Sequence, residues 1–169
     1  MSYFKSRRSA VVARKGAVAT SQPLAAQAGL QMLRDGGNAI DAAVATAAVL
    51  NVVEPMSTGI GGDMFALIWD KNERKVVSLN GSGRQAAAAN VADVRKAGYE
   101  SIPNNGPGSQ FAVSVPGTVH GWETALNQYG RMTLKEVLQP AIDYALNGYA
   151  VSEVIAHGWG GADTFTKLN

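Results

Sequence analysis

The sequence contains no cysteine. Disulfides, zinc sites with thiolate ligands and cysteine nucleophiles are therefore excluded. Histidine is scarce as well, because His120 and His157 are the only two, and they are not clustered and stand on or beside different expected helices. We therefore expect no metal site.

Long apolar runs are also missing. The most apolar stretch, residues 39–53, is interrupted by Asp41, Thr46 and Asn51, so no segment has the length of a transmembrane helix and we expect no membrane partner. The N-terminus is basic but has no apolar core behind it, unlike a secretory signal. These two absences favour a cytoplasmic location.

Charge is low and uneven. Charged residues make up 17% of the 169 residues and hydrophobic ones 46%, which is typical of one globular domain. The first 15 residues hold five of the 15 basic residues and none of the 13 acidic ones, so residues 1–15 form a basic N-terminal arm and residues 16–169 a mildly acidic body. No base-reading motif accompanies the arm, so we expect no nucleic-acid partner.

Periodicity and turn residues predict a mixed α and β domain. The expected helices cover 22–34 with Ser21 as N-cap, the stretch capped by Asn38 that runs to 53, 89–98, 118–129, 134–147 and a last one beginning at 151. The expected strands cover 64–69, 75–79 and 111–115. Residues 9–12 and 16–19 read as short extended pieces.

The sequence predicts how two of these helices pack. The one ending at residue 53 is apolar nearly all round, which predicts burial, and its alanines permit close contact with a sheet. In the helix from Thr118, one buried face is expected from the spacing of Val119, Trp122, Leu126 and Tyr129.

Two glycine-rich turns indicate a site. Gly59, Gly61 and Gly62 precede the first expected strand and permit positive φ or close backbone approach, and Gly-Ser-Gly at 81–83 follows the second strand. Arg84 comes directly after it, where its guanidinium could grip a carboxylate. The alternative for Arg84 is a structural ion pair or a helix C-terminal cap.

Other chemistry is less well supported by the pattern. Asp63 could orient a ligand amine, although an Asp after a glycine turn more often hydrogen-bonds that turn. Ser114 and His120 form a nominal nucleophile and base, but no Gly-x-Ser-x-Gly motif is present. The turn at 57–62 lacks the Gly-Lys-Ser/Thr ending of a phosphate-binding loop and precedes a strand, so a nucleotide site is disfavoured.

Several motifs, in this order and spacing, resemble the γ-glutamyltransferase (γ-glutamyltranspeptidase) family. They are Gly16–Ser21, Gly36–Ala45, Glu54-Pro55, Gly59–Phe65, Val115–Trp122, Leu138–Ala145 and Gly148–Ser152. The resemblance runs from about Ala10 through nearly the whole chain and matches the N-terminal part of the family's large subunit.

The resemblance implies an α+β fold, the αββα sandwich of N-terminal-nucleophile hydrolases, incomplete in this chain. It implies a precursor that cleaves itself and a threonine nucleophile whose α-amine is the base, both expected beyond Asn169 in a C-terminal remainder or small subunit. No catalytic residue is then expected within these residues, and no cofactor. Arg84 matches the family's arginine that binds the substrate α-carboxylate.

The implied function is transfer or hydrolysis of γ-glutamyl groups from glutathione or other γ-glutamyl amides through an acyl-threonine. The segment Asn80–Gln85 departs from the Phe-Arg-Glu context typical of the family and resembles a branch related to cephalosporin and glutaryl acylases. An amidase acting on such acyl groups is therefore one alternative. A non-catalytic binding module is another, if the chain is complete.

Overall fold

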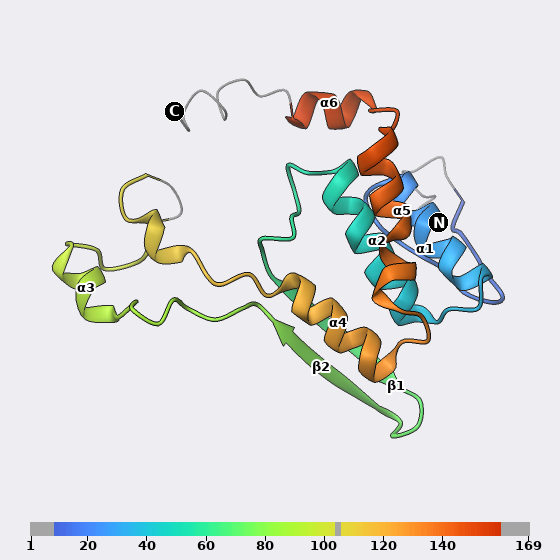
Figure 1. Cartoon of the computed structure of the whole chain (residues 1–169), viewed down its shortest axis with the longest axis horizontal. Helices are drawn as coiled ribbons and strands as arrows, with labels where there is room; N and C mark the ends of the chain where they lie inside the picture. The colour runs from blue at the N-terminus through green and yellow to red at the C-terminus, as the bar shows by residue number, and fades with distance from the viewer. Residues whose placement is uncertain (1–8, 104–105, 160–169) are drawn as a thin grey trace, which may run out of the picture.

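The computed structural model describes residues 9–103 and 106–159. Its helices and strands follow one another in the order shown in Figure 1. They are α1 (Pro23–Arg34), α2 (Ala39–Val53), β1 (Met64–Asp70), β2 (Lys75–Gly81), α3 (Val91–Lys96), the 3-10 turn η1 (Ser109–Ala112), α4 (Thr118–Tyr129), α5 (Leu134–Asn147) and α6 (Glu153–Trp159).

Most predicted elements are confirmed, with two corrections. Residues 111–115 do not form a strand: η1 ends at Ala112, and Ser114 joins Gln85 only by an isolated bridge. Ser21 is not the N-cap of α1, because its hydroxyl donates to Glu54 at 2.6 Å. Gln22 caps α1 instead, through an Oε1 atom that accepts from the first backbone N–H groups of the helix.

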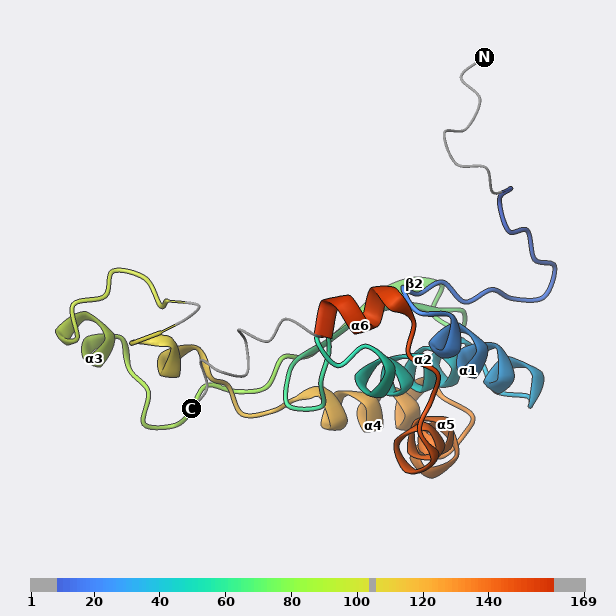
Figure 2. The same ribbon diagram turned by 90° about the horizontal axis from the view of Figure 1, so that it is seen from above.

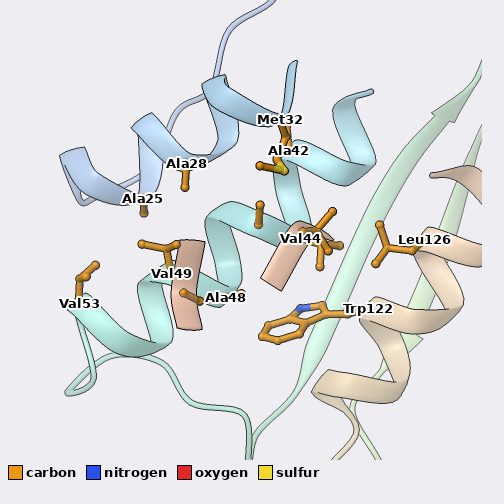
Figure 3. Close-up of a cluster of buried hydrophobic side chains, with 13 residues drawn as sticks. Ala25, Ala28, Met32, Ala42, Val44, Ala48, Val49, Val53, Trp122 and Leu126 are labelled. Atoms are coloured by element: carbon orange, nitrogen blue, oxygen red, sulfur yellow. The ribbon is translucent and has the colours of Figure 1, made fainter. Parts of the chain in front are cut away.

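Helix α2 lies at the centre of the helical body. It packs against α1 on one side and against α5 and α4 on the other, and Figure 3 shows Val44, Ala48 and Val49 of α2 between α1 and Trp122 of α4. The predicted burial of α2 is confirmed. Its small side chains serve helix-to-helix contact rather than the expected contact with a sheet, because α1, α5 and α4 surround it.

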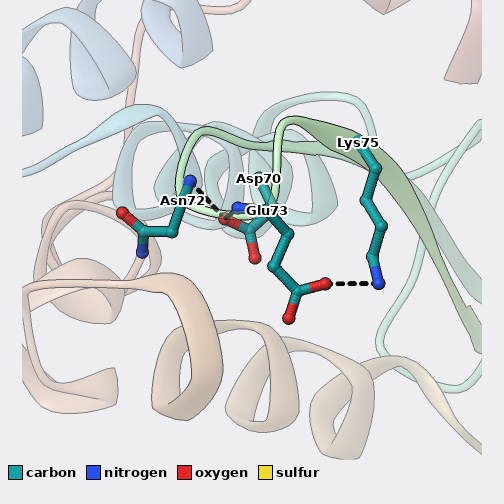
Figure 4. Close-up of polar contacts among 4 residues, drawn as sticks. All are labelled: Asp70, Asn72, Glu73 and Lys75. Atoms are coloured by element: carbon teal, nitrogen blue, oxygen red, sulfur yellow. Dashed lines mark hydrogen bonds and ion pairs between the residues drawn. The ribbon is translucent and has the colours of Figure 1, made fainter.

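The two strands form an antiparallel hairpin in register from Met64 opposite Gly81 to Asp70 opposite Lys75. At its tip, Asp70 accepts hydrogen bonds from the backbone N–H groups of Asn72 and Glu73 at 2.8 and 3.3 Å (Figure 4). Glu73 also pairs with Lys75 and raises the pKa of that ammonium. Both side chains of this pair are exposed, so it adds little stability.

Helix α4 covers one face of the hairpin. Its predicted buried face is partly correct: Trp122 and Leu126 are buried, but Val119 is 41% exposed and the small residues Gly121 and Ala125 complete the face instead. Gly121 permits this packing, because a Cβ there would lie 3.0 Å from the Met64 sulfur. Among the residues that the structure describes, nothing covers the apolar side chains on the other face of the hairpin, where Leu67 is 80% exposed between Phe65 and Trp69.

The fold class is thus mixed α and β. Within the described residues the only sheet has two strands, so the four-layer sandwich is not visible at this extent of chain. No helix of residues 9–103 and 106–159 combines the length and the apolar character needed to cross a membrane.

Candidate functional site

Three glycine-containing segments converge at one end of the hairpin. Because β1 and β2 are antiparallel, the turn before Met64 lies beside the segment that follows Gly81. The Gly62 carbonyl then accepts hydrogen bonds from the backbone N–H groups of Gly117 and Thr118, both at 3.2 Å, at the start of α4. We call this meeting point the glycine junction (residues 59–62, 81–83 and 115–118).

Two backbones approach closely in the junction, but not at the glycines that the sequence indicated. Gly59, Gly61 and Gly62 are not in the positive-φ region, and a Cβ would have open space at the first two. Gly83 has φ +81°, and a Cβ there would lie 1.8 Å from the Val115 carbonyl oxygen. A Cβ at Gly117 would lie 2.2 Å from the Gly81 carbonyl oxygen, so it is here that two backbones touch.

Beyond the junction the chain leaves the body and returns. Two neighbouring segments, residues 82–85 and 113–117, form a neck, and residues 86–103 and 106–112 form an arm that carries α3 and η1. Figures 1 and 2 both show α3 lying well apart from the helical body. The arm has its own packing, with Tyr99 and Phe111 edge to face at 6.4 Å between ring centroids.

Arg84 stands on this neck, next to the glycine junction. Its carbonyl oxygen accepts a 2.7 Å hydrogen bond from the N–H of Val115, which fixes its backbone. Its side chain is exposed, and within the described residues its guanidinium makes no ion pair and no hydrogen bond. Neither structural alternative, an ion pair or a helix cap, is therefore seen there, and an exposed unpaired guanidinium is suited to bind a carboxylate.

The other polar candidates do not assemble into a site. Asp63 is exposed beside the junction, and within the described residues its carboxylate does not hydrogen-bond its own turn. Ser114 donates to the Ser82 carbonyl at 3.4 Å rather than facing His120, which is exposed on α4. Across residues 9–103 and 106–159, no group of three or more potential metal ligands gathers.

Two residues that make contacts in the junction and neck were not predicted from the sequence to do so. Gln85 donates from its side-chain amide to the Phe111 carbonyl oxygen at 3.1 Å, and Gly117 makes the close backbone contact. Nothing in the sequence pairs Gln85 with residue 111 or Gly117 with residue 81.

A wide groove lies elsewhere in the described structure. It is open, has a volume of about 1250 Å³ and lies between residues 15–20 and helices α1 and α2. None of the junction residues lines it, and neither does Arg84. Within the described residues, Arg84 therefore lies on an exposed surface and not in this groove.

Comparisons with known proteins agree on one family. Residues 25–168 match the family described as Gamma-glutamyltranspeptidase. The glutathione hydrolase-like YwrD proenzyme of Bacillus subtilis (strain 168) is 48% identical over 143 residues, which are 84% of this chain and 26% of that protein. The chain thus spans about a quarter of the length of this relative.

Solved structures that resemble this chain include a gamma-glutamyltranspeptidase and an acylase. The cephalosporin acylase from Bacillus halodurans superposes with a TM-score of 0.78 at 43% identity, over 98% of this chain and 32% of that one. The Helicobacter pylori gamma-glutamyltranspeptidase superposes with a TM-score of 0.77 at 37% identity, over 88% of this chain and 42% of that one.

Proposed function

The chain belongs to the gamma-glutamyltranspeptidase family, and we propose that it forms the N-terminal part of an acyl-transfer enzyme acting on γ-glutamyl amides such as glutathione. In this proposal a threonine outside these residues attacks the γ-carbonyl carbon and forms an acyl-threonine, and the amine of the donor leaves. Water or an acceptor amine then releases the acyl group. The proenzyme name of the relative fits a precursor whose C-terminal remainder supplies the nucleophile.

The described residues contribute capture of the substrate carboxylate. The observation that carries this role is the exposed Arg84 guanidinium, held on a fixed backbone and without an acidic partner in the described residues. A planar guanidinium binds a carboxylate through two parallel hydrogen bonds, which fixes the orientation of the acyl chain as well as its charge. Arg84 would thereby set the distance between the carboxylate and the scissile amide.

A glutaryl amidase is the second candidate. Glutaryl and γ-glutamyl groups have the same chain length and the same terminal carboxylate, and they differ only in the α-amine. Arg84 therefore serves both equally well. The likeness to a cephalosporin acylase favours this candidate, and the groups that recognise the amine, which we place outside the chain, decide between the two.

Substitution of Arg84 tests the proposal. In the full-length enzyme, Arg84→Lys keeps the charge but loses the planar fork, so kcat/KM for γ-glutamyl-p-nitroanilide should fall by about 10- to 150-fold, equivalent to about 1.5 to 3 kcal/mol. The 4-aminobutanoyl anilide lacks the carboxylate and should be turned over equally by both enzymes. Arg95→Lys, at an exposed arginine of α3, is the matched control and should leave both donors unaffected.

Unchanged kinetics of Arg84→Lys on the γ-glutamyl donor would remove Arg84 from the site. A comparison of γ-glutamyl and glutaryl anilides with the unsubstituted enzyme separates the two candidate functions. Faster turnover of the γ-glutamyl donor supports the transferase or hydrolase, and faster turnover of the glutaryl donor supports the acylase.

A further inference from the structure

The neck holds Arg84 between two different kinds of contact. On the side of the body, the backbones of Gly83 and Val115 lie so close that a Cβ at Gly83 would be 1.8 Å from the Val115 carbonyl oxygen. On the side of the arm, the isolated bridge between Gln85 and Ser114 continues the pairing. Arg84 lies between these contacts, and its own carbonyl oxygen takes part through Val115.

The side-chain tie on the arm side is made by Gln85. Its Nε2 donates to the carbonyl oxygen of Phe111 at 3.1 Å and so connects the outgoing segment to the returning one. On the body side, a second side chain crosses the neck, because Ser114 Oγ reaches the Ser82 carbonyl at 3.4 Å. The longer serine contact is the weaker of the two, so Gln85 is the stronger side-chain brace across the neck.

We infer that Gln85 is a positioning residue that holds Arg84 in the orientation needed to bind the carboxylate of the acyl donor. This inference rests on the proposed function of Arg84. Two chemical properties suit an amide to this position. An amide N–H donates to the Phe111 carbonyl, which a carboxylate cannot do, and a neutral side chain next to Arg84 leaves the guanidinium charge free for the substrate.

The role predicts a specific kinetic signature. Gln85→Met in the full-length enzyme keeps the length of the side chain and removes the hydrogen bond. For γ-glutamyl-p-nitroanilide, KM should rise about threefold to tenfold, the loss expected for one neutral hydrogen bond, while kcat changes less than about twofold. Gln85→Glu should raise KM further, because it also places a negative charge beside Arg84. For 4-aminobutanoyl anilide, which has no carboxylate, both variants should match the unsubstituted enzyme.

Gln110→Met is the matched control. Gln110 lies in the arm beside Phe111, and its side chain accepts a hydrogen bond from the N–H of Gly108 at 2.9 Å rather than crossing between the two segments of the neck. This variant should leave KM unchanged. Equal effects of Gln85→Met on both donors, or equal effects of the two methionine variants, would overturn the inference.

Amide hydrogen exchange gives a readout that needs no turnover. The N–H of Val115 donates to the Arg84 carbonyl, so its exchange should accelerate in Gln85→Met and remain slow in Arg84→Lys and Gln110→Met. Unaltered exchange at Val115 in Gln85→Met would overturn the inference while leaving the role of Arg84 intact. If Arg84→Lys does not change the preference for a carboxylate, the proposed function fails even when Gln85→Met loosens the neck.

Discussion

At the scale of single residues, Asp41 is the most deeply embedded charged group of the described structure. Its side chain is fully buried and accepts hydrogen bonds from the backbone N–H groups of Asn38 at 2.6 Å and of Arg131 and Met132 at 3.0 Å. Gly130 leaves room for it, because a Cβ there would lie 2.8 Å from Asp41 Oδ1. One carboxylate thus joins the start of α2 to the loop between α4 and α5.

Replacing this carboxylate should be costly. Asp41→Asn replaces one of the two accepting carboxylate oxygens by an NH2 group, a donor that faces backbone N–H groups. We therefore expect the free energy of unfolding of the full-length protein to fall by about 2 to 4 kcal/mol. Urea denaturation measures this. Asp35→Asn is the control, because Asp35 is exposed and, among the described residues, bonds only Gln31, through its side chain and through the last turn of α1. This variant should cost less than about 0.5 kcal/mol. Similar losses in the two variants would contradict the anchoring role of Asp41.

At the scale of elements, α5 begins with a capping box. Thr133 Oγ1 accepts from the N–H of Glu136, and Glu136 accepts from the N–H and the hydroxyl of Thr133. These hydrogen bonds from Thr133 lower the pKa of Glu136 below its ordinary value of 4.5. The sequence predicted the start of this helix at residue 134, and the structure adds the capping box of Thr133 and Glu136 as its physical reason.

The lowered pKa gives α5 a pH-dependent contribution to stability. A carboxyl whose pKa is lower in the folded state stabilises the fold above its unfolded pKa, near 4.5 here, and this contribution disappears as the pH falls through the folded pKa. Thr133→Val should therefore reduce stability at pH 7 and make it fall less steeply below about pH 4.5. The measurement is Tm against pH for both proteins. Parallel curves would show that Thr133 does not set the ionisation of Glu136.

At the scale of the whole molecule, the exposed apolar face of the hairpin departs from an ordinary globular surface. Phe65, Leu67 and Trp69 are exposed along β1, with Val76 opposite Trp69. Contiguous apolar surface of this kind marks an interface. The chain spans about a quarter of a curated relative, so we propose that a further layer of the same protein covers this face.

This surface predicts how residues 1–169 behave alone. The isolated chain should self-associate through the hairpin face and release no product from a γ-glutamyl anilide, because the proposed nucleophile lies outside it. Leu67→Lys should lower the association measured by sedimentation velocity. Leu146→Lys, at a 77% exposed leucine of α5 outside the hairpin, is the matched control. A monomeric unsubstituted chain, or equal effects of the two lysines, would contradict this prediction.

The sequence by itself determined what depends on neighbouring residues. The extents of α1, α2, α4, α5 and the hairpin follow from periodicity, caps and glycine turns. The position of Arg84 just after β2 followed in the same way. These features are local, because each depends on residues only a few positions apart along the chain.

The tertiary structure alone decided what depends on distant residues. The hydroxyl of Ser21 binds Glu54 instead of capping α1, and residues 111–115 lie in a turn and one side of the neck instead of a strand. Gly83 and Gly117, rather than the turn at 59–62, make the close backbone approach, and the side chain of Gln85 bonds the Phe111 carbonyl oxygen on the returning segment. Each of these outcomes is set by a competition among partners that are far apart in sequence, and local preferences differ by too little free energy to decide such a competition before the chain has folded.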